Sequence, residues 1–315
     1  MQKAIILIIL ATLALNAAAQ DANNDRYHDG DVAVVNAIIK NNELDATPDN
    51  PASWNFVLWN KDAVRRIIGL DLTFKSLTGT LNLSGLIKLN WLDSDNNRQL
   101  TSIDVSGCNS LIRLSCIKNS LNSINLSGCK ALKILSCTNN RLTELNVSEC
   151  SALIELYIRR NEMKTLNVSG HTELTQLECN ENQLSELNVS KCVALKRLDC
   201  QKNNLTSLNV SGLIGLTELF CNENRLTSLN LSGCKALDTM DCGDNELTKL
   251  DVSECISLTG LACQHNKLTS LNVSNLIYLK ELYCGYNLLT VLDVSKLTKL
   301  DDLYYDGNPN ITVKR

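Results

Sequence analysis

Leucine recurs at a fixed spacing of 21 residues through most of this chain. An asparagine follows eight residues after each of these leucines. A pattern that repeats without a gap over ten units predicts a repeat architecture in which each unit folds as one coil. The leucines are Leu111, Leu132, Leu153, Leu174, Leu195, Leu216, Leu237, Leu258, Leu279 and Leu300, and the asparagines are Asn119, Asn140, Asn161, Asn182, Asn203, Asn224, Asn245, Asn266, Asn287 and Asn308.

We number the positions of a unit from this leucine. One unit then reads L-x-x-L-x-C-x-x-N-x-L-T-x-L-N-V-S-x-C-x-x, with apolar residues at positions 1, 4, 6, 11, 14, 16 and 19. The alternation at positions 4 and 6 predicts a short half-buried strand, and the asparagine at position 9 marks a turn. A single coil cannot bury its own apolar side, so the pattern predicts a solenoid of stacked coils.

The L-x-x-L-x-C-x-x-N-x-L core resembles the signature of leucine-rich repeat proteins, with cysteine for the third leucine. The 21-residue unit with a strand cysteine is most similar to the internalin J type of bacterial surface protein, over residues 67–315. The resemblance implies a leucine-rich repeat domain of about 11–12 coils. It also implies a curved right-handed solenoid with a parallel β-sheet on the concave face, a turn-rich convex side, inward-turned asparagines, and a role in adhesion or host-factor recognition.

The first 20 residues, "MQKAIILIILATLALNAAAQ", have the features of a secretory signal peptide. An apolar run from Ala4 to Leu15 follows Lys3 and ends in small residues, which places cleavage near Ala19. This run is too short to span a bilayer, and no later stretch reaches the roughly 18 apolar residues that a spanning helix needs. We therefore expect residues 1–19 to direct the protein to the periplasm, the cell surface or the medium, with no transmembrane segment.

Terminal coils of a solenoid expose apolar faces and need covers. Residues 20–66 are predicted to form a small N-terminal cap. Its helix is expected in "DGDVAVVNAIIKNN", with Asp29 or Asp31 as the N-cap and an apolar stripe that includes Val35 and Ile38. The other end, "LYYDGNPNITVKR", is an altered coil without an evident cap, so it is a candidate surface for self-association.

All 14 cysteines lie in the repeat, at positions 6 and 19 of the unit. Export and an even count favour disulfides. However, Ile158 and Leu213 occupy these positions in other units, which indicates apolar sites, and stacked neighbours would have parallel Cβ vectors that suit a disulfide poorly. We favour a ladder of reduced thiols that packs like small hydrophobic residues, with disulfides and a metal site as the alternatives.

Charge and motifs narrow the classes of function. The chain has 44% hydrophobic residues and a formal net charge of −4, so we expect no nucleic acid partner. The sequence contains no H-E-x-x-H, G-x-S-x-G or phosphate loop, and His171 stands where other units have a core cysteine. Residues 93–97 have calcium-loop spacing, but Arg98 occupies the place of the required glycine. We expect no enzyme, no cofactor and no metal site.

The variable residues at positions 3, 5, 7 and 8 flank each strand and should point outward. Aromatic residues are enriched there, and aromatic side chains on an exposed rigid sheet are typical anchors for partners. Tyr283 and Tyr304 share position 5 of adjacent units and should stack about 4.8 Å apart beside Tyr286. The residues expected to bind a ligand are Trp91, Tyr157, Arg159, Arg160, Phe220, Tyr283, Tyr286 and Tyr304.

The charges on this face change along the chain, from basic residues such as Arg197 and Lys202 to acidic residues such as Asp241, Glu281 and Asp302. Ordinary cross-strand packing of a soluble sheet is one explanation. We favour a non-catalytic extracellular binding module that recognises a protein or glycan through the concave face. The alternative is a structural, self-assembling surface protein that uses the uncapped C-terminal coil.

Overall fold

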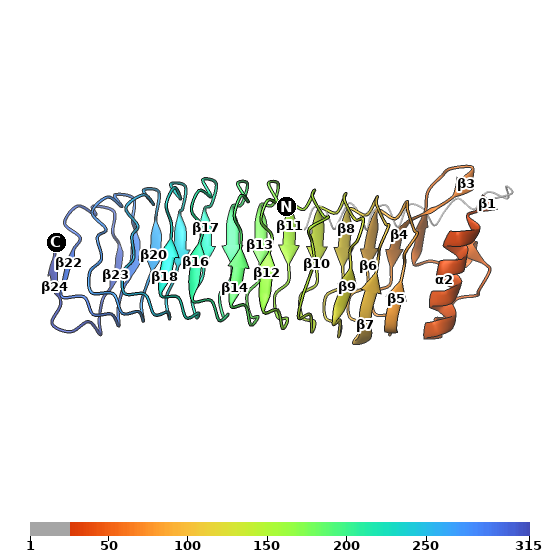
Figure 1. Cartoon of the computed structure of the whole chain (residues 1–315), viewed down its shortest axis with the longest axis horizontal. Coiled ribbons are helices and arrows are strands. Elements are labelled where there is room, and N and C mark those ends of the chain that lie inside the picture. The colour runs from red at the N-terminus through yellow and green to blue at the C-terminus, as the bar shows by residue number, and fades with distance from the viewer. Residues whose placement is uncertain (1–25) are drawn as a thin grey trace.

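Residues 26–315 are described by the computed structural model, and the predicted signal peptide lies outside the described residues. They form one stack of coils, with a helix at the N-terminal end (Figure 1). The leucine-rich repeat solenoid predicted from the sequence is confirmed. Its main sheet has thirteen strands: β2 (Val57–Trp59), β4 (Ile67–Asp71), β6 (Trp91–Asp93), β8 (Arg113–Ser115), β10 (Ile134–Ser136), β11 (Glu155–Tyr157), β13 (Gln176–Glu178), β15 (Arg197–Asp199), β17 (Glu218–Phe220), β19 (Thr239–Asp241), β20 (Gly260–Ala262), β21 (Glu281–Tyr283) and β23 (Asp302–Tyr304).

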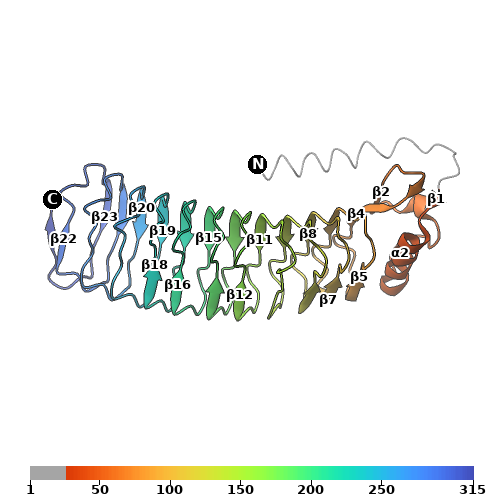
Figure 2. The ribbon, with the colours of Figure 1, turned by 45° about the horizontal axis from the view of Figure 1, so that its top comes forward.

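The main sheet keeps one register along the solenoid. Only β2 pairs antiparallel, with β4, and every later pair is parallel. Equivalent unit positions face each other, so that Leu135 pairs with Leu156 and Tyr283 with Tyr304. Position 4 is buried from β4 to β21 and half-buried in β23, while positions 3 and 5 are mostly half-buried or exposed. The sheet lies along the concave edge of a gently curved solenoid (Figure 2).

The opposite side also carries strands, at positions 13 to 15 of several units, which the sequence pattern did not predict. They form one three-stranded and several two-stranded ribbons, and the wider β5–β7 pair contains a register shift where the early coils are one residue longer. Within residues 26–315, no helix is both long and apolar enough to cross a lipid bilayer. The ribbons comprise β5 (Thr78–Asn82), β7 (Gln99–Asp104), β9 (Ser123–Asn125), β12 (Thr165–Asn167), β14 (Glu186–Asn188), β16 (Ser207–Asn209), β18 (Ser228–Asn230), β22 (Val291–Asp293) and β24 (Thr312–Lys314).

The interior is built from leucine and cysteine. All 14 cysteines are buried and free, in agreement with the favoured thiol ladder. Burial raises the pKa of the Cys108 thiol to about 12 and that of Cys192 to about 11, so these thiols are protonated at neutral pH and unreactive. Position-19 thiols also contact the preceding coil, as where Cys192 donates to Val168 O at 3.1 Å. His171 takes the same place, with Nδ1 2.9 Å from Val168 O and Nε2 3.1 Å from Val147 O.

The asparagines at position 9 join neighbouring coils. Asn203 is typical: its Oδ1 accepts from Leu184 N at 2.9 Å, and its Nδ2 lies 3.1, 3.0 and 3.2 Å from the carbonyl oxygens of Cys179, Cys200 and Gln201. These backbone groups lie inside the turn, where water does not reach them, so an unpaired group there is destabilising. The inward orientation implied by the family resemblance is therefore confirmed.

Helix α2 (Asp29–Asn42) covers the N-terminal end, together with β1 (Arg26–Tyr27), β3 (Val64–Arg65) and the 3₁₀ helix η2 (Pro51–Ser53). The predicted N-cap was wrong, because His28 precedes the helix and its Nδ1 accepts from Asp31 N at 3.3 Å.

Asp31 instead joins the helix to the first coil. Its carboxylate is buried and accepts from the guanidinium of Arg66 at 2.9 Å and from Ile67 N at 2.8 Å. A buried carboxylate with a bidentate cation and a backbone donor fixes the helix in one place over the end of the core.

Candidate recognition surface

One column of the concave face has an unusual backbone. Position 8 adopts the left-handed conformation in every coil, with φ between 52° and 60° in eleven residues that are not glycine. This conformation costs an L-residue about 1 kcal/mol relative to glycine, yet the column carries large side chains that are exposed or half-buried. The column comprises Phe74, Asn96, Lys118, Asn139, Arg160, Glu181, Lys202, Glu223, Asp244, His265, Tyr286 and Gly307.

We compare two stretches of this face, each four coils long and defined by positions 3, 5, 7 and 8. The middle face belongs to the coils that start at Leu153, Leu174, Leu195 and Leu216, and the C-terminal face to those that start at Leu237, Leu258, Leu279 and Leu300. Position 7 points only partly outward, because Asn180 of the middle face and Gly285 of the C-terminal face are buried there.

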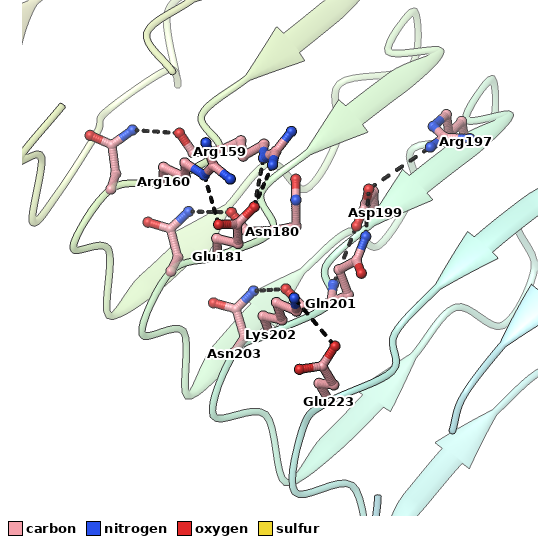
Figure 3. Close-up of polar contacts among 12 residues, drawn as sticks. Arg159, Arg160, Asn180, Glu181, Arg197, Asp199, Gln201, Lys202, Asn203 and Glu223 are labelled. Atoms are coloured by element: carbon pink, nitrogen blue, oxygen red, sulfur yellow. Dashed lines mark hydrogen bonds and ion pairs between the residues drawn. The ribbon is translucent and has the colours of Figure 1, made fainter. Parts of the chain in front are cut away.

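The cations of the middle face are paired with carboxylates of neighbouring coils (Figure 3). Arg159 and Arg160 both contact Glu181, at 2.6 and 2.7 Å. Lys202 lies 3.5 Å from Glu223. These contacts lower the pKa of Glu181, and the hydrogen bond from Arg160 is the largest cause. Two predicted ligand-binding residues, Arg159 and Arg160, are thus held within the protein's own ion-pair network.

Arg197 lies at the centre of the middle face. Its guanidinium pairs with Glu218, lies 3.9 Å from Glu178 and 3.8 Å from Asp199, and stands 4.6 Å from the centre of the Phe220 ring. Phe220, another predicted site residue, is therefore covered by an arginine of the preceding coil. This arrangement combines a cation–π contact with ion pairs, so the arginine charge is paired and the ring is covered by the same side chain.

Trp91 and Tyr157 lie against their own surroundings. A Cβ atom added to Gly69 would come within 2.2 Å of the Trp91 ring, so the indole rests directly on this glycine of the preceding coil. The Tyr157 hydroxyl donates to Glu155 at 2.9 Å. Neither residue lies beside the tyrosines predicted near the C-terminal end, since six strand spacings separate β11 from β21, or about 29 Å.

The remaining three predicted residues lie together on the C-terminal face. Tyr283 and Tyr304 pair directly in register on β21 and β23. Tyr286 stacks flat on His265, with ring centres 4.4 Å apart and 6° between the planes, and its ring centre is 6.4 Å from that of Tyr304. Tyr283, Tyr286 and Tyr304 keep 37%, 50% and 38% of their surface exposed. A hydrogen bond with Tyr286 raises the pKa of Tyr304.

The C-terminal face also differs in charge. It carries five carboxylates and neither lysine nor arginine. In the part of the chain that the structure describes, none of the five forms an ion pair within 4 Å. Burial raises the pKa of Asp241, and a hydrogen bond from Gly243 N offsets this rise only in part. The five carboxylates are Asp241, Asp244, Glu281, Asp302 and Asp306.

Sequence reasoning missed His265, which extends the aromatic cluster by one coil. The signal was present, because His265 and Tyr286 occupy position 8 of consecutive units.

Two shallow depressions, of about 360 and 110 Å³, lie away from the C-terminal face. One is beside Phe74 and Arg98, and the other is beside Ser127 and Asn146. Among the described residues no group of three or more His, Cys, Asp or Glu could hold a metal ion.

Comparison with known proteins supports the fold. No protein-family model matches the chain, and no curated protein sequence matches it. Among solved structures, the functional domain of InlJ from Listeria monocytogenes, described as including a cysteine ladder, is 33% identical, with a TM-score of 0.70. The match covers 78% of this chain and 54% of that chain, so this chain spans about half the length of the InlJ chain.

Two more distant structures share the fold alone. A leucine-rich repeat protein from Leptospira interrogans is 23% identical, with a TM-score of 0.53, over 78% of this chain and 79% of that chain. YopM from Yersinia pestis, described as a leucine-rich effector protein, is 22% identical, also with a TM-score of 0.53 and the same coverage. These matches and the InlJ match agree on stacked leucine-rich coils.

Proposed function

Because this chain is a leucine-rich repeat protein whose cysteine ladder is similar to that of InlJ, we propose that it is a non-catalytic extracellular binding module. It recognises a protein or glycan through the concave face of its repeat sheet. The neighbouring structures support a protein-binding repeat module in general terms, and fold alone does not fix a ligand. Export rests on the signal peptide predicted at residues 1–19.

The exposed tyrosines of the C-terminal face carry this proposal. Tyr283, Tyr286 and Tyr304 lie on a rigid sheet, and their rings contribute little to the buried core. Large aromatic side chains that remain accessible at low conformational entropy are frequent anchors of binding interfaces. The left-handed column supports the same proposal, because large side chains at position 8 oppose backbone preference and so serve something other than stability.

A binding screen tests the proposal. Wild-type protein and the Tyr283→Ala/Tyr304→Ala variant would be applied to protein and glycan arrays, with Tyr278→Ala as the matched control. Tyr278 is 48% exposed but lies at position 21, outside the face defined by positions 3, 5, 7 and 8. Hits that bind wild type and Tyr278→Ala but lose at least about tenfold in affinity to the double variant would support the proposal. Equal binding by all three proteins would contradict it.

A further inference from the structure

The middle face contains a complete arginine site formed by the protein itself. Arg197, at position 3, is held by Glu178 at position 5 of the preceding coil and by Glu218 at position 3 of the next coil. The ring of Phe220, at position 5 of the next coil, lies under the guanidinium. A second arginine at position 3, Arg113, pairs in the same way with position 5 of its preceding coil, Asp93.

The same arrangement recurs three coils later without the arginine. Gly260 occupies position 3, and register places Glu281 directly beside it and Tyr283 beside Ala262. Asp241 stands at position 5 of the preceding coil, as Glu178 does relative to Arg197. Three of the four groups around Arg197 therefore have counterparts around Gly260: a carboxylate before it, a carboxylate after it and an aromatic ring.

The position above Gly260 is open. A Cβ atom built on this glycine would meet only one atom within 4 Å, the Thr239 methyl group at 4.0 Å. Tyr283 is exposed, and Asp241 and Glu281 have no cation within 4 Å among the described residues. Burial without a cation also raises the pKa of Asp241. By strand register, one ring and two carboxylates thus lie on the two strands that flank a position without a side chain of its own.

We propose that the C-terminal face binds an arginine side chain of a partner protein at the position above Gly260, between Asp241, Glu281 and Tyr283. This proposal rests on the proposed binding function and names the chemistry of its partner. Tyr304, Asp302 and Asp306 continue the aromatic and acidic surface beyond this position and fit a partner with further cations nearby.

Arginine fits this position better than lysine. Its planar guanidinium can stack on the Tyr283 ring while its edge donates to a carboxylate, as Arg197 lies over Phe220 and donates to Glu218. A lysine ammonium would satisfy the charge but cannot stack, and it is more strongly hydrated. The site therefore discriminates between the two cations, whereas an acidic surface without the ring would not.

The experiment uses three six-residue peptides, of arginine, lysine and citrulline, with the binding of each measured by isothermal titration calorimetry at about 0.15 M salt. The key variant is Gly260→Arg, which supplies the arginine from within the chain. Gly260 lies on β20 and outside the left-handed region, so the backbone accepts a side chain. Thr298→Arg adds the same charge at an exposed residue off the concave face and is the matched control.

We expect hexa-arginine to bind wild type and Thr298→Arg equally, and Gly260→Arg about tenfold more weakly. Glu281→Gln should also weaken binding, and the lysine and citrulline peptides should bind at least about threefold more weakly than arginine. The Gly260→Arg variant should unfold at a temperature no lower than wild type. Equal hexa-arginine affinity for Gly260→Arg and Thr298→Arg, or equal affinities for the arginine and lysine peptides, would overturn the arginine site.

The two proposals can fail separately. A partner from the array screen that needs Tyr283 and Tyr304, yet binds Gly260→Arg as tightly as wild type, would overturn the arginine site and leave the recognition function in place. Loss of hexa-arginine binding in Gly260→Arg would support the arginine site whatever the array screen returns.

Discussion

The middle face and the C-terminal face are built on the same backbone, yet their side chains differ in how far they satisfy one another. Both have the same strand register, the same buried leucines and cysteines, and the same left-handed column. On the middle face, four cations pair with carboxylates of adjacent coils, and Arg197 covers Phe220. On the C-terminal face, among the described residues, the five carboxylates form no ion pair within 4 Å and the three exposed tyrosines form no cation–π contact. The scaffold positions the side chains, and internal charge compensation decides which of them remain available to a partner.

Slow reaction of the buried thiols should confirm that the middle face and the C-terminal face share one interior, and this is the largest change that we expect. Burial raises the pKa of Cys108 to about 12 from 9.0, and raises those of Cys200 and Cys263 as well. Shifts of two to three pKa units, as for Cys192 and Cys108, correspond to roughly 100- to 1000-fold less thiolate. Native thiols should therefore react with a disulfide reagent at pH 8 at least about 100-fold more slowly than unfolded ones. Denatured, unreduced protein should titrate all 14 thiols. Missing thiols after denaturation, or a rapidly reacting subset in one stretch, would contradict a common interior of reduced, buried thiols.

The asparagine ladder should be equally important in both stretches. Asn203→Ala and Asn287→Ala each remove the partners of one buried N–H and of carbonyls on two coils, and each should lower the free energy of unfolding by about 3 kcal/mol. Urea denaturation measures the change. Asn204→Ala, outside the ladder, should change it by less than about 0.5 kcal/mol. Losses near zero, or losses that differ severalfold between the two stretches, would contradict a common scaffold.

Removing one side chain should convert the middle face into a second copy of the C-terminal site. Arg197→Ala exposes Phe220 between Glu178 and Glu218, so calorimetry should find a second hexa-arginine site. The free energy of unfolding should fall by about 1 kcal/mol, because the lost ion pairs are partly exposed. Lys196→Ala removes an equal charge from the neighbouring exposed residue and should leave the stoichiometry unchanged. Unchanged stoichiometry in Arg197→Ala would show that charge compensation does not distinguish the two faces.

Replacement of Asp241, a carboxylate without a cation partner, should change the free energy of unfolding least. Burial raises the pKa of Asp241, so the folded protein holds this proton more tightly than the unfolded chain does. The resulting stability is present below the unfolded-state pKa and is lost as pH rises through the folded-state pKa. Asp241→Asn should therefore stabilise the protein at pH 7 by about 0.5 kcal/mol and have no effect near pH 3, as urea denaturation at both pH values would show.

Asp199 provides the comparison for Asp241. Burial raises the pKa of Asp199 too, but its carboxylate lies 3.8 Å from Arg197. Asp199→Asn should bring no gain at pH 7, since it removes a partner of that cation. A gain equal to that of Asp241→Asn would mean that Arg197 does not compensate the buried charge.

Most of the fold could be predicted because the repeat fixes burial and register together. Once Leu135 and Leu156 occupy the same unit position, stacking leaves one way to pair their strands. The cysteine environment followed from the apolar residues that replace cysteine in other units, such as Ile158. The N-cap of α2 did not follow, because Asp29, Asp31 and His28 can all supply an acceptor and only the packing of Asp31 against Arg66 selects among them.

The candidate site could be predicted only in part. Register placed Tyr283 beside Tyr304. The pairing of Arg159 and Arg160 with one glutamate depends on the conformations that these long side chains adopt between coils. The unit positions do not determine those conformations. The importance of Gly260 was hidden for another reason. A glycine adds no chemistry of its own, and its role becomes visible only when the surroundings of Arg197 are known.

The left-handed column also sets a limit on how a partner can follow the solenoid. Its side chains recur about every 4.8 Å, whereas alternate residues of an extended chain recur about every 6.7 Å and the turns of a helix about every 5.4 Å. The repeat distance of the column therefore matches neither that of a helix nor that of an extended chain. A helix laid along the column drifts by about 0.6 Å per coil and is half a step out of phase after about four coils, and a strand loses phase almost at once. A specific footprint is therefore short, about as long as the C-terminal face, and a solenoid of this length has room for more than one.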